Sequence, residues 1–152
     1  MNKALFLDRD GVINIDKAYV YRKEDFEFSK GIFDFCRRYQ DEGFMIIVIT
    51  NQAGIAREIY SEKDFLDLTD WMKRQFIKHG INIAKVFYCP HHPDITGPCL
   101  CRKPNPGMIL QARDEFDLDL SRCIMIGDKE SDLQAGRNAG IPESNLKLYR
   151  IK

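Results

Sequence analysis

Two aspartates at the end of a short apolar run have the clearest capacity for chemistry in this chain. The run Ala4–Leu7 stops at Asp8, Arg9, Asp10 and Gly11. Residues i and i+2 of an extended chain share one face, so the carboxylates of Asp8 and Asp10 can converge on one site. Two carboxylates that close repel unless a cation offsets their charge, and Mg²⁺ is a hard cation that binds oxygen ligands. The alternative is a plain surface turn, in which Asp and Gly are common.

A second cluster combines cysteine and histidine. Cys89 and His91 are followed, after a short loop, by Cys99 and Cys101. Four soft donors in two close pairs fit a tetrahedral zinc site, and four protein ligands leave no open position for a substrate. The turn-rich loop has little apolar content, so a metal would supply the energy that fixes it. We therefore predict structural Zn²⁺, with chance clustering or a redox pair as alternatives. His92 is expected to be a surface residue.

The elements that position these clusters alternate along the chain. Apolar runs predict strands at Ala4–Leu7, Phe44–Thr50, Ala84–Cys89, Cys123–Gly127 and Leu146–Tyr149. Helical patterns cover Gly31–Glu42 and Ser61 to His79. A third helix is predicted with Asn105 as N-cap and Pro106 at its first position, and a fourth over Asp132–Ala139 with Ser131 as its cap. Such alternation predicts an α/β fold, a Rossmann-like open parallel sheet with helices on both faces.

The ends of the predicted strands carry unusual polar residues. Besides the aspartates, these are Thr50 with Asn51, Cys89 with His91, and Asp128 with Lys129. Open parallel sheets bind ligands at the carboxyl ends of their strands, so we expect these side chains to share one edge. The segment Gly11–Ser29 is too long for a tight turn and is expected to form a flap over that edge.

Composition restricts the remaining function classes. The 152 residues predict a single domain over positions 1–152. The 23 basic and 23 acidic residues balance, which argues against a nucleic-acid binder. No apolar run approaches the ~20 residues that span a membrane. No signal peptide is visible, so we expect a cytoplasmic monomer whose cysteines are thiols or metal ligands.

Four segments together resemble the motifs of the haloacid dehalogenase-like phosphatases, in the family's order and across nearly the whole chain. Phe6–Val12 is similar to the first motif, Ile49–Gln52 to the second, Cys101–Pro104 to the third and Ile126–Asp132 to the fourth. The resemblance implies a phosphatase with no large cap domain, whose site is screened only by residues 11–29 and the zinc loop.

The resemblance also implies roles for single residues. Asp8 would attack phosphorus to form an aspartyl-phosphate, and Asp10 would protonate the leaving alkoxide and later deprotonate water. Mg²⁺ would be held by Asp8, Asp128 and the backbone carbonyl of Asp10. As further catalytic residues, the Thr50 hydroxyl can donate to a phosphate oxygen, and Lys103 supplies a compact positive charge.

Substrate binding is expected to involve Asn51, Arg102 and Lys129. The zinc ligands immediately precede Arg102 and Lys103, so zinc would clamp the loop that presents both. Asp132 is expected to lie next to the magnesium ligands without binding the ion itself.

The zinc-type loop narrows the resemblance to a subgroup that acts on small phosphate esters. Within this subgroup, three segments are closer to enzymes that act on heptose phosphates: Asp10–Asn14, Cys89–Pro93 and Lys103–Met108. The resemblance therefore implies a sugar phosphate as substrate, foremost a heptose 1,7-bisphosphate cleaved at C7 in a bacterial surface-polysaccharide pathway. Histidinol phosphate is the alternative, favoured by the short loop between His91 and Cys99. Less favoured alternatives are a polynucleotide 3′-phosphatase and a non-catalytic, zinc-stabilised binding protein.

Overall fold

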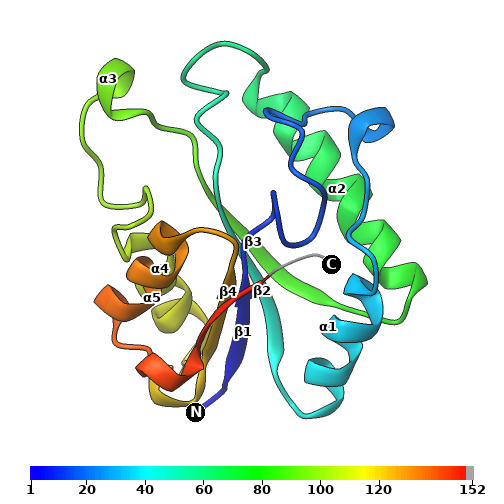
Figure 1. Cartoon of the computed structure of the whole chain (residues 1–152), viewed down its shortest axis with the longest axis vertical. Coiled ribbons are helices and arrows are strands. Elements are labelled where there is room, and N and C mark those ends of the chain that lie inside the picture. Colours follow the sequence, from blue (N-terminus) through cyan, green and yellow to red (C-terminus); the bar gives the residue numbers. More distant parts are fainter. Residues whose placement is uncertain (150–152) are drawn as a thin grey trace.

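The structure is a computed structural model that describes residues 1–149. Its centre is a five-stranded, fully parallel sheet in the order β3-β2-β1-β4-β5 (Figure 1). The strands are β1 (Ala4–Leu7), β2 (Met45–Asn51), β3 (Ile83–Cys89), β4 (Ile124–Gly127) and β5 (Leu146–Leu148). Each lies within one residue of its predicted bounds at either end.

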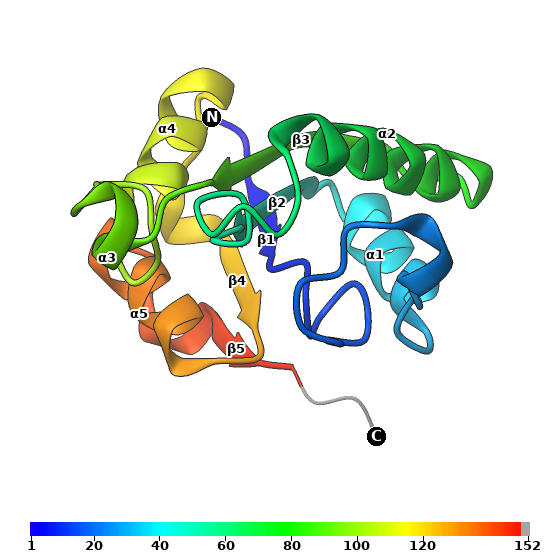
Figure 2. The same ribbon diagram turned by 90° about the horizontal axis from the view of Figure 1, so that it is seen from above.

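Helices cover both faces of this sheet (Figure 2). On one face lie α1 (Ile32–Asp41) and α2 (Glu62–Lys78), and on the other α4 (Gly107–Phe116) and α5 (Glu130–Ala139). The one-turn helix α3 (Pro93–Thr96) lies between β3 and α4. The predicted α/β class, a Rossmann-like open sheet, is confirmed. None of the helices in residues 1–149 has the length and apolar character to cross a membrane.

Strand β1 is buried on both faces and divides its side chains between two cores. Leu5 and Leu7 pack with residues of α1 and α2, whereas Ala4 and Phe6 pack with residues of α4 and α5. Successive strand residues point to opposite faces, which produces this division. All four side chains are fully buried, so β1 delivers Asp8 from a rigid, central position.

The predicted start of the third long helix is wrong by one residue. Helix α4 begins at Gly107, and the Asn105 side chain donates to the carbonyl of Cys99 at 2.8 Å instead of capping the helix. The N–H of Gly107 donates to the carbonyl of Leu100 at 3.0 Å, and a Cβ at Gly107 would lie 2.2 Å from that oxygen. The loop that carries Cys99 and Cys101 therefore packs against the start of α4, and its carbonyl groups accept the hydrogen bonds of Asn105 and Gly107.

The predicted start of the last helix is also wrong. Helix α5 begins at Glu130, so Ser131 lies within it. The carboxylate of Asp132 caps the helix instead, because it accepts the backbone N–H of Lys129 at 3.1 Å and of Asp128 at 3.2 Å. This cap fixes the turn that follows β4.

Candidate active site

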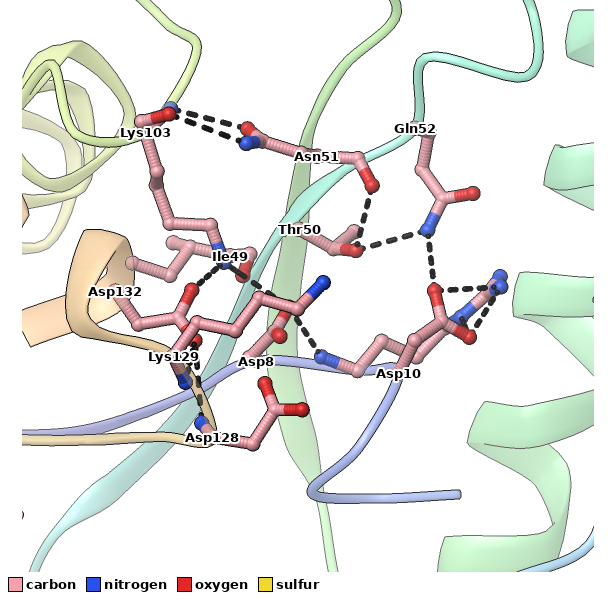
Figure 3. A network of polar contacts seen from close by, with 11 residues as sticks. Asp8, Asp10, Ile49, Thr50, Asn51, Gln52, Lys103, Asp128, Lys129 and Asp132 are labelled. Carbon is pink, nitrogen blue, oxygen red and sulfur yellow. Dashed lines mark hydrogen bonds and ion pairs between the residues drawn. The ribbon is translucent and has the colours of Figure 1, made fainter. Parts of the chain in front are cut away.

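The polar ends of the strands meet at a cavity of about 630 Å³ at the carboxyl edge of the sheet. Figure 3 shows the polar contacts that join them. Of the predicted site residues, those lining the cavity are Asp8, Asp10, Asn51, Arg102, Lys103 and Lys129. The segment Gly11–Ser29, which was expected to form a flap, also lines the cavity through Asp16, Ala18 and Tyr19.

Lys103 is buried beside the cavity and holds two carboxylates. Its Nζ lies 3.0 Å from Asp8 Oδ1 and 2.6 Å from Asp132 Oδ1, and it donates to the carbonyl of Ile49 at 3.0 Å. Burial by itself lowers the pKa of Lys103, but the two carboxylates outweigh it and raise the pKa above its usual value. Lys103 therefore stays charged and fixes the orientation of Asp8.

Negative charge is in excess around Asp8. Burial raises the pKa of Asp8 to about 7; Lys103 opposes this rise, and the nearby carboxylates of Asp132 and Asp10 add to it. A buried carboxylate beside others is costly to ionise, because water no longer solvates its charge. A further cation near Asp8 would relieve this cost.

Asp128 supplies an oxygen suited to such a cation. Carboxylate oxygens of Asp8, Asp128 and Asp132 lie within 4.8 Å of one another, and Asp128 Oδ1 is buried with no hydrogen-bond partner. Both oxygens of Asp132 are engaged, one by Lys103 and the other by backbone N–H groups. The donor set of Asp8 and Asp128 therefore fits Mg²⁺, a hard cation that takes oxygen ligands.

Gly11 allows the backbone to pass directly beside Asp128. Its φ is +94°, and a Cβ there would lie 2.1 Å from Asp128 Oδ2. Any other residue at position 11 would displace this carboxylate, in addition to the strain of a positive φ. The glycine is thus part of the geometry that brings the loops after β1 and β4 together.

The carboxylate of Asp10 is held by three neighbouring side chains. Arg9, which is 2 % exposed, donates to both of its oxygens at 2.9–3.2 Å. Asn14 donates to Oδ1 at 3.0 Å, and Gln52 donates to Oδ2 at 3.1 Å. Asp10 therefore lines the cavity in one fixed orientation. The side chains that hold it are different from Lys103, which holds Asp8.

The two residues at the end of β2 play different structural parts. Thr50 is buried, and its hydroxyl oxygen accepts the amide of Gln52 at 2.8 Å. Asn51 accepts the backbone N–H of Lys103 at 3.0 Å and donates to the Lys103 carbonyl at 3.3 Å. Asn51 thus borders the cavity and also locks the backbone that carries Lys103.

The cysteine and histidine ligands predicted for zinc lie together. Ligand atoms of Cys89, His91, Cys99 and Cys101 are within 4.8 Å of one another. The Cys99 sulfur is 3.6 Å from each of the other two sulfurs, which lie 2.7 Å apart. Tetrahedral sulfur ligands about 2.3 Å from zinc are separated by roughly 3.8 Å. Two of the three sulfur pairs are close to this separation, and the pair of Cys89 and Cys101 would open by about 1 Å to hold the ion.

The expectation that His92 is exposed is wrong. Its side chain is 13 % exposed, because it caps α3 and packs against a second loop. Nδ1 accepts the N–H of Asp94 at 3.1 Å, and Nε2 lies 3.0 Å from the guanidinium of Arg57. The zinc loop is therefore joined to the loop that follows β2.

The residues that hold Asp10 escaped prediction, although Arg9 and Gln52 lie within the segments that resemble family motifs. Arg9, Asn14 and Gln52 hold Asp10, and the position of Gln52 directly after Thr50 and Asn51 also hinted at involvement. Lys129, which was expected to bind substrate, is exposed at the cavity, and its charge opposes the burial that raises the pKa of Asp128. The ion pair with Asp8 is made by Lys103.

Known sequences similar to this chain are phosphatases. Residues 100–143 match a family model described as HAD-hydrolase-like. The chain is 56 % identical over 139 residues to a D-glycero-alpha-D-manno-heptose-1,7-bisphosphate 7-phosphatase of Campylobacter jejuni, covering 91 % of this chain and 78 % of that protein. It is 50 % identical over 148 residues to a D-glycero-beta-D-manno-heptose-1,7-bisphosphate 7-phosphatase of Helicobacter pylori, covering 97 % and 83 %.

Solved structures agree with these sequence relatives. D,D-heptose 1,7-bisphosphate phosphatase from B. bronchiseptica, complexed with magnesium and phosphate, superposes with a TM-score of 0.84 at 30 % identity, covering 98 % of this chain and 93 % of that one. An HAD-like phosphatase from Mesorhizobium loti gives a TM-score of 0.86 at 34 % identity, covering 91 % and 69 %. The likeness thus extends over the sheet and the loops that border the cavity.

Proposed function

Because the chain belongs to the haloacid dehalogenase-like phosphatases, in the family of the heptose-1,7-bisphosphate 7-phosphatases, we propose that it removes the C7 phosphate of D-glycero-D-manno-heptose 1,7-bisphosphate. One observation carries the mechanism. The carboxylate of Asp8 is buried at the cavity wall, aimed by Lys103, and within 4.8 Å of the carboxylate of Asp128.

Asp8 is the proposed nucleophile. A carboxylate oxygen of Asp8 attacks phosphorus, the bond from phosphorus to the sugar oxygen breaks, and an aspartyl-phosphate forms. Asp10 gives its proton to the leaving oxygen, and then takes a proton from the water that attacks phosphorus and restores Asp8. Asp10 suits this second role because it lines the same cavity but makes none of the contacts that fix Asp8.

Magnesium dependence is part of the proposal. Asp8 and Asp128, with the backbone carbonyl of Asp10, would hold Mg²⁺, which supplies positive charge that stabilises the phosphoryl group in the transition state. The unpartnered oxygen of Asp128 and the raised pKa of Asp8 support this assignment. Lys103 adds a fixed positive charge, and the hydroxyl of Thr50 donates to a phosphoryl oxygen.

The remaining cavity residues are proposed to bind the rest of the substrate. A volume of about 630 Å³ accommodates a phosphorylated sugar, since ligand pockets commonly measure ~300–1,000 Å³. Arg102 and Lys129 line the wall and can bind anionic oxygens, and Asn51 keeps Lys103 in place. The named relatives act on either the alpha or the beta anomer, so the anomer is a question for experiment.

Zn²⁺ is proposed as a structural ion held by the four residues predicted from the sequence. Arg102 follows the last of these ligands directly, and its Nη1 donates to the carbonyl of His91 at 3.3 Å. Fixing the loop therefore fixes the start of the segment that carries Arg102 and Lys103. We propose a cytoplasmic location, where reduced thiols are available as zinc ligands.

A substrate panel tests the proposal. The purified protein is assayed for phosphate release with both anomers of heptose 1,7-bisphosphate, histidinol phosphate and simple sugar phosphates, each with Mg²⁺. We expect the highest kcat/KM with one heptose anomer and product that retains the C1 phosphate. A preference for histidinol phosphate would refute the substrate assignment.

A further inference from the structure

Gln52 is a buried polar residue at the edge of the cavity that the reaction described above does not use. It is 2 % exposed and follows the last residue of β2. Its Nε2 lies 3.1 Å from Asp10 Oδ2 and 2.8 Å from Thr50 Oγ1. Its Oε1 accepts the hydroxyl of Tyr60. One amide thus joins the proposed acid–base residue to the proposed phosphate-binding hydroxyl (Figure 3).

The chemistry of these partners settles which way the amide faces. The carboxyl group of Asp10 accepts from Arg9 and Asn14, which are donors. It presents Oδ2 to Gln52 as a further acceptor, so the nitrogen of Gln52 faces Asp10. The two hydrogens of that nitrogen then go to Asp10 and Thr50. The oxygen of Thr50 is consequently an acceptor towards Gln52, and its own hydrogen faces the carbonyl of Asn51 at a long 3.4 Å. A phosphoryl oxygen can replace this weak contact.

Tyr60 anchors the far end of the amide. Its side chain is buried, and its ring stacks on Tyr21 with the centroids 5.4 Å apart. The ring also packs directly against the backbone of Gly54, where a Cβ would lie 2.2 Å from it. Tyr21 belongs to the 11–29 segment, so the contact also ties that segment to Gln52.

Gln52 differs from the other donors to Asp10 in where it comes from. Arg9 and Asn14 belong to the same loop as Asp10 and can move with it. Gln52 belongs to the end of β2, next to Thr50, so it fixes Asp10 relative to the place where phosphate binds. Among the donors to Asp10, Gln52 therefore defines its distance from the reacting atoms.

We infer that Gln52, held by Tyr60, is a positioning residue that sets Asp10 for proton transfer, an inference that rests on the proposed function. In the first step, Asp10 protonates the sugar oxygen as its bond to phosphorus breaks and the bond from Asp8 forms. A phenolate leaving group is weakly basic and needs no such proton. Loss of Gln52 should therefore slow the first step for a sugar phosphate far more than for an aryl phosphate.

The test compares Gln52→Leu with wild type in single-turnover rapid-quench experiments, using heptose 1,7-bisphosphate and p-nitrophenyl phosphate. A positioned acid contributes ~100- to 10,000-fold, so misplacing it should cost about 10- to 100-fold in the rate with the sugar, with KM within about threefold. Nitrophenol release in the first turnover should change by less than about threefold, because Thr50 can still donate to phosphate. Equal losses with both substrates, a sugar rate within about twofold of wild type, or a loss carried wholly by KM would overturn the inference.

A second, milder variant keeps the inference testable if Gln52→Leu does not fold. Tyr60→Phe keeps the ring against Tyr21 but removes the hydroxyl that anchors Gln52, and we expect the same substrate split at about 3- to 10-fold. Tyr39→Phe is the matched control, since Tyr39 lies on α1 and packs only on Phe35 and Phe44 among the aromatic rings of residues 1–149. It should leave both rates unchanged. Wild type inactive on both substrates would refute the proposed function itself, whereas an active wild type with no split overturns only the role of Gln52.

Discussion

Replacing Lys103 with methionine should destabilise the protein strongly, and more so at alkaline pH. Lys103 is buried, and its ammonium lies 3.0 Å from Asp8 and 2.6 Å from Asp132. Methionine fills a similar volume, so the change removes the charge and leaves little cavity. Two buried carboxylates then face each other without a cation between them, which typically costs ~3–5 kcal/mol when one member of a buried ion pair is removed.

The pH dependence follows from Asp8. In the metal-free protein the folded-state pKa of Asp8 is about 7, above its unfolded value of ~3.9. A carboxyl with a raised folded pKa favours folding when protonated, so its contribution to stability declines as pH rises from about 4 to about 7. Loss of Lys103, which lowers this pKa, should raise it further. At pH 5 Asp8 is protonated in both folded proteins, whereas at pH 8 a rise of about two pKa units makes the penalty ~1 kcal/mol larger than at pH 5.

Urea unfolding of both proteins in Mg²⁺-free buffer at pH 5 and pH 8 measures this difference. Lys129→Met is the control, because it removes an exposed lysine at the same cavity whose charge acts on Asp128, and it should change the free energy of unfolding by less than ~0.5 kcal/mol. A loss below ~1 kcal/mol for Lys103→Met at pH 8, or an equal loss at both pH values, would refute the electrostatic reasoning.

Three further predictions concern the metal sites. Gly11→Ala should abolish measurable Mg²⁺ binding by calorimetry and reduce phosphate release at least ~10-fold by pushing Asp128 aside, whereas Gly80→Ala, which has a φ of +78° but open space around its Cβ, should cost stability alone. Normal Mg²⁺ binding by Gly11→Ala would contradict this. Affinity for Mg²⁺ should rise with pH up to about 7 and then level off, because the ion must displace the proton of Asp8; a flat profile from pH 5.5 to 8 would count against Asp8 as a ligand. Elemental analysis should find about one zinc per chain in wild type and less than ~0.5 in Cys99→Ser, and equal contents in both would exclude the proposed zinc ligands.

The sequence revealed the sheet well, because its strands are buried on both faces. Ala4–Leu7 and the run around Ile46–Ile49 are continuously apolar, and this pattern has few alternatives to a central parallel strand. Once the strands are known, their carboxyl ends must share an edge, so the convergence of Asp8, Asn51 and Asp128 could be predicted from position alone.

The contacts that organise the site could not be predicted in this way. Lys103 and Asp8 are 95 positions apart, and which lysine of the cavity pairs with Asp8 depends on how the cysteine loop packs on α4. That packing also explains the missed start of α4, since the carbonyl of Cys99 engages Asn105. His92 was misjudged because its partner Arg57 lies in a different loop.

The most direct test of the central claim is ³¹P NMR of heptose 1,7-bisphosphate incubated with Mg²⁺ and either wild type or Asp8→Asn. The amide that this substitution introduces has the shape of the carboxylate but is not a nucleophile towards phosphorus. We expect wild type to remove the C7 ester signal and leave the C1 signal, and the variant to leave both unchanged. Phosphate release by Asp8→Asn at the wild-type rate, or loss of the C1 signal first, would contradict the claim that Asp8 attacks the C7 phosphate.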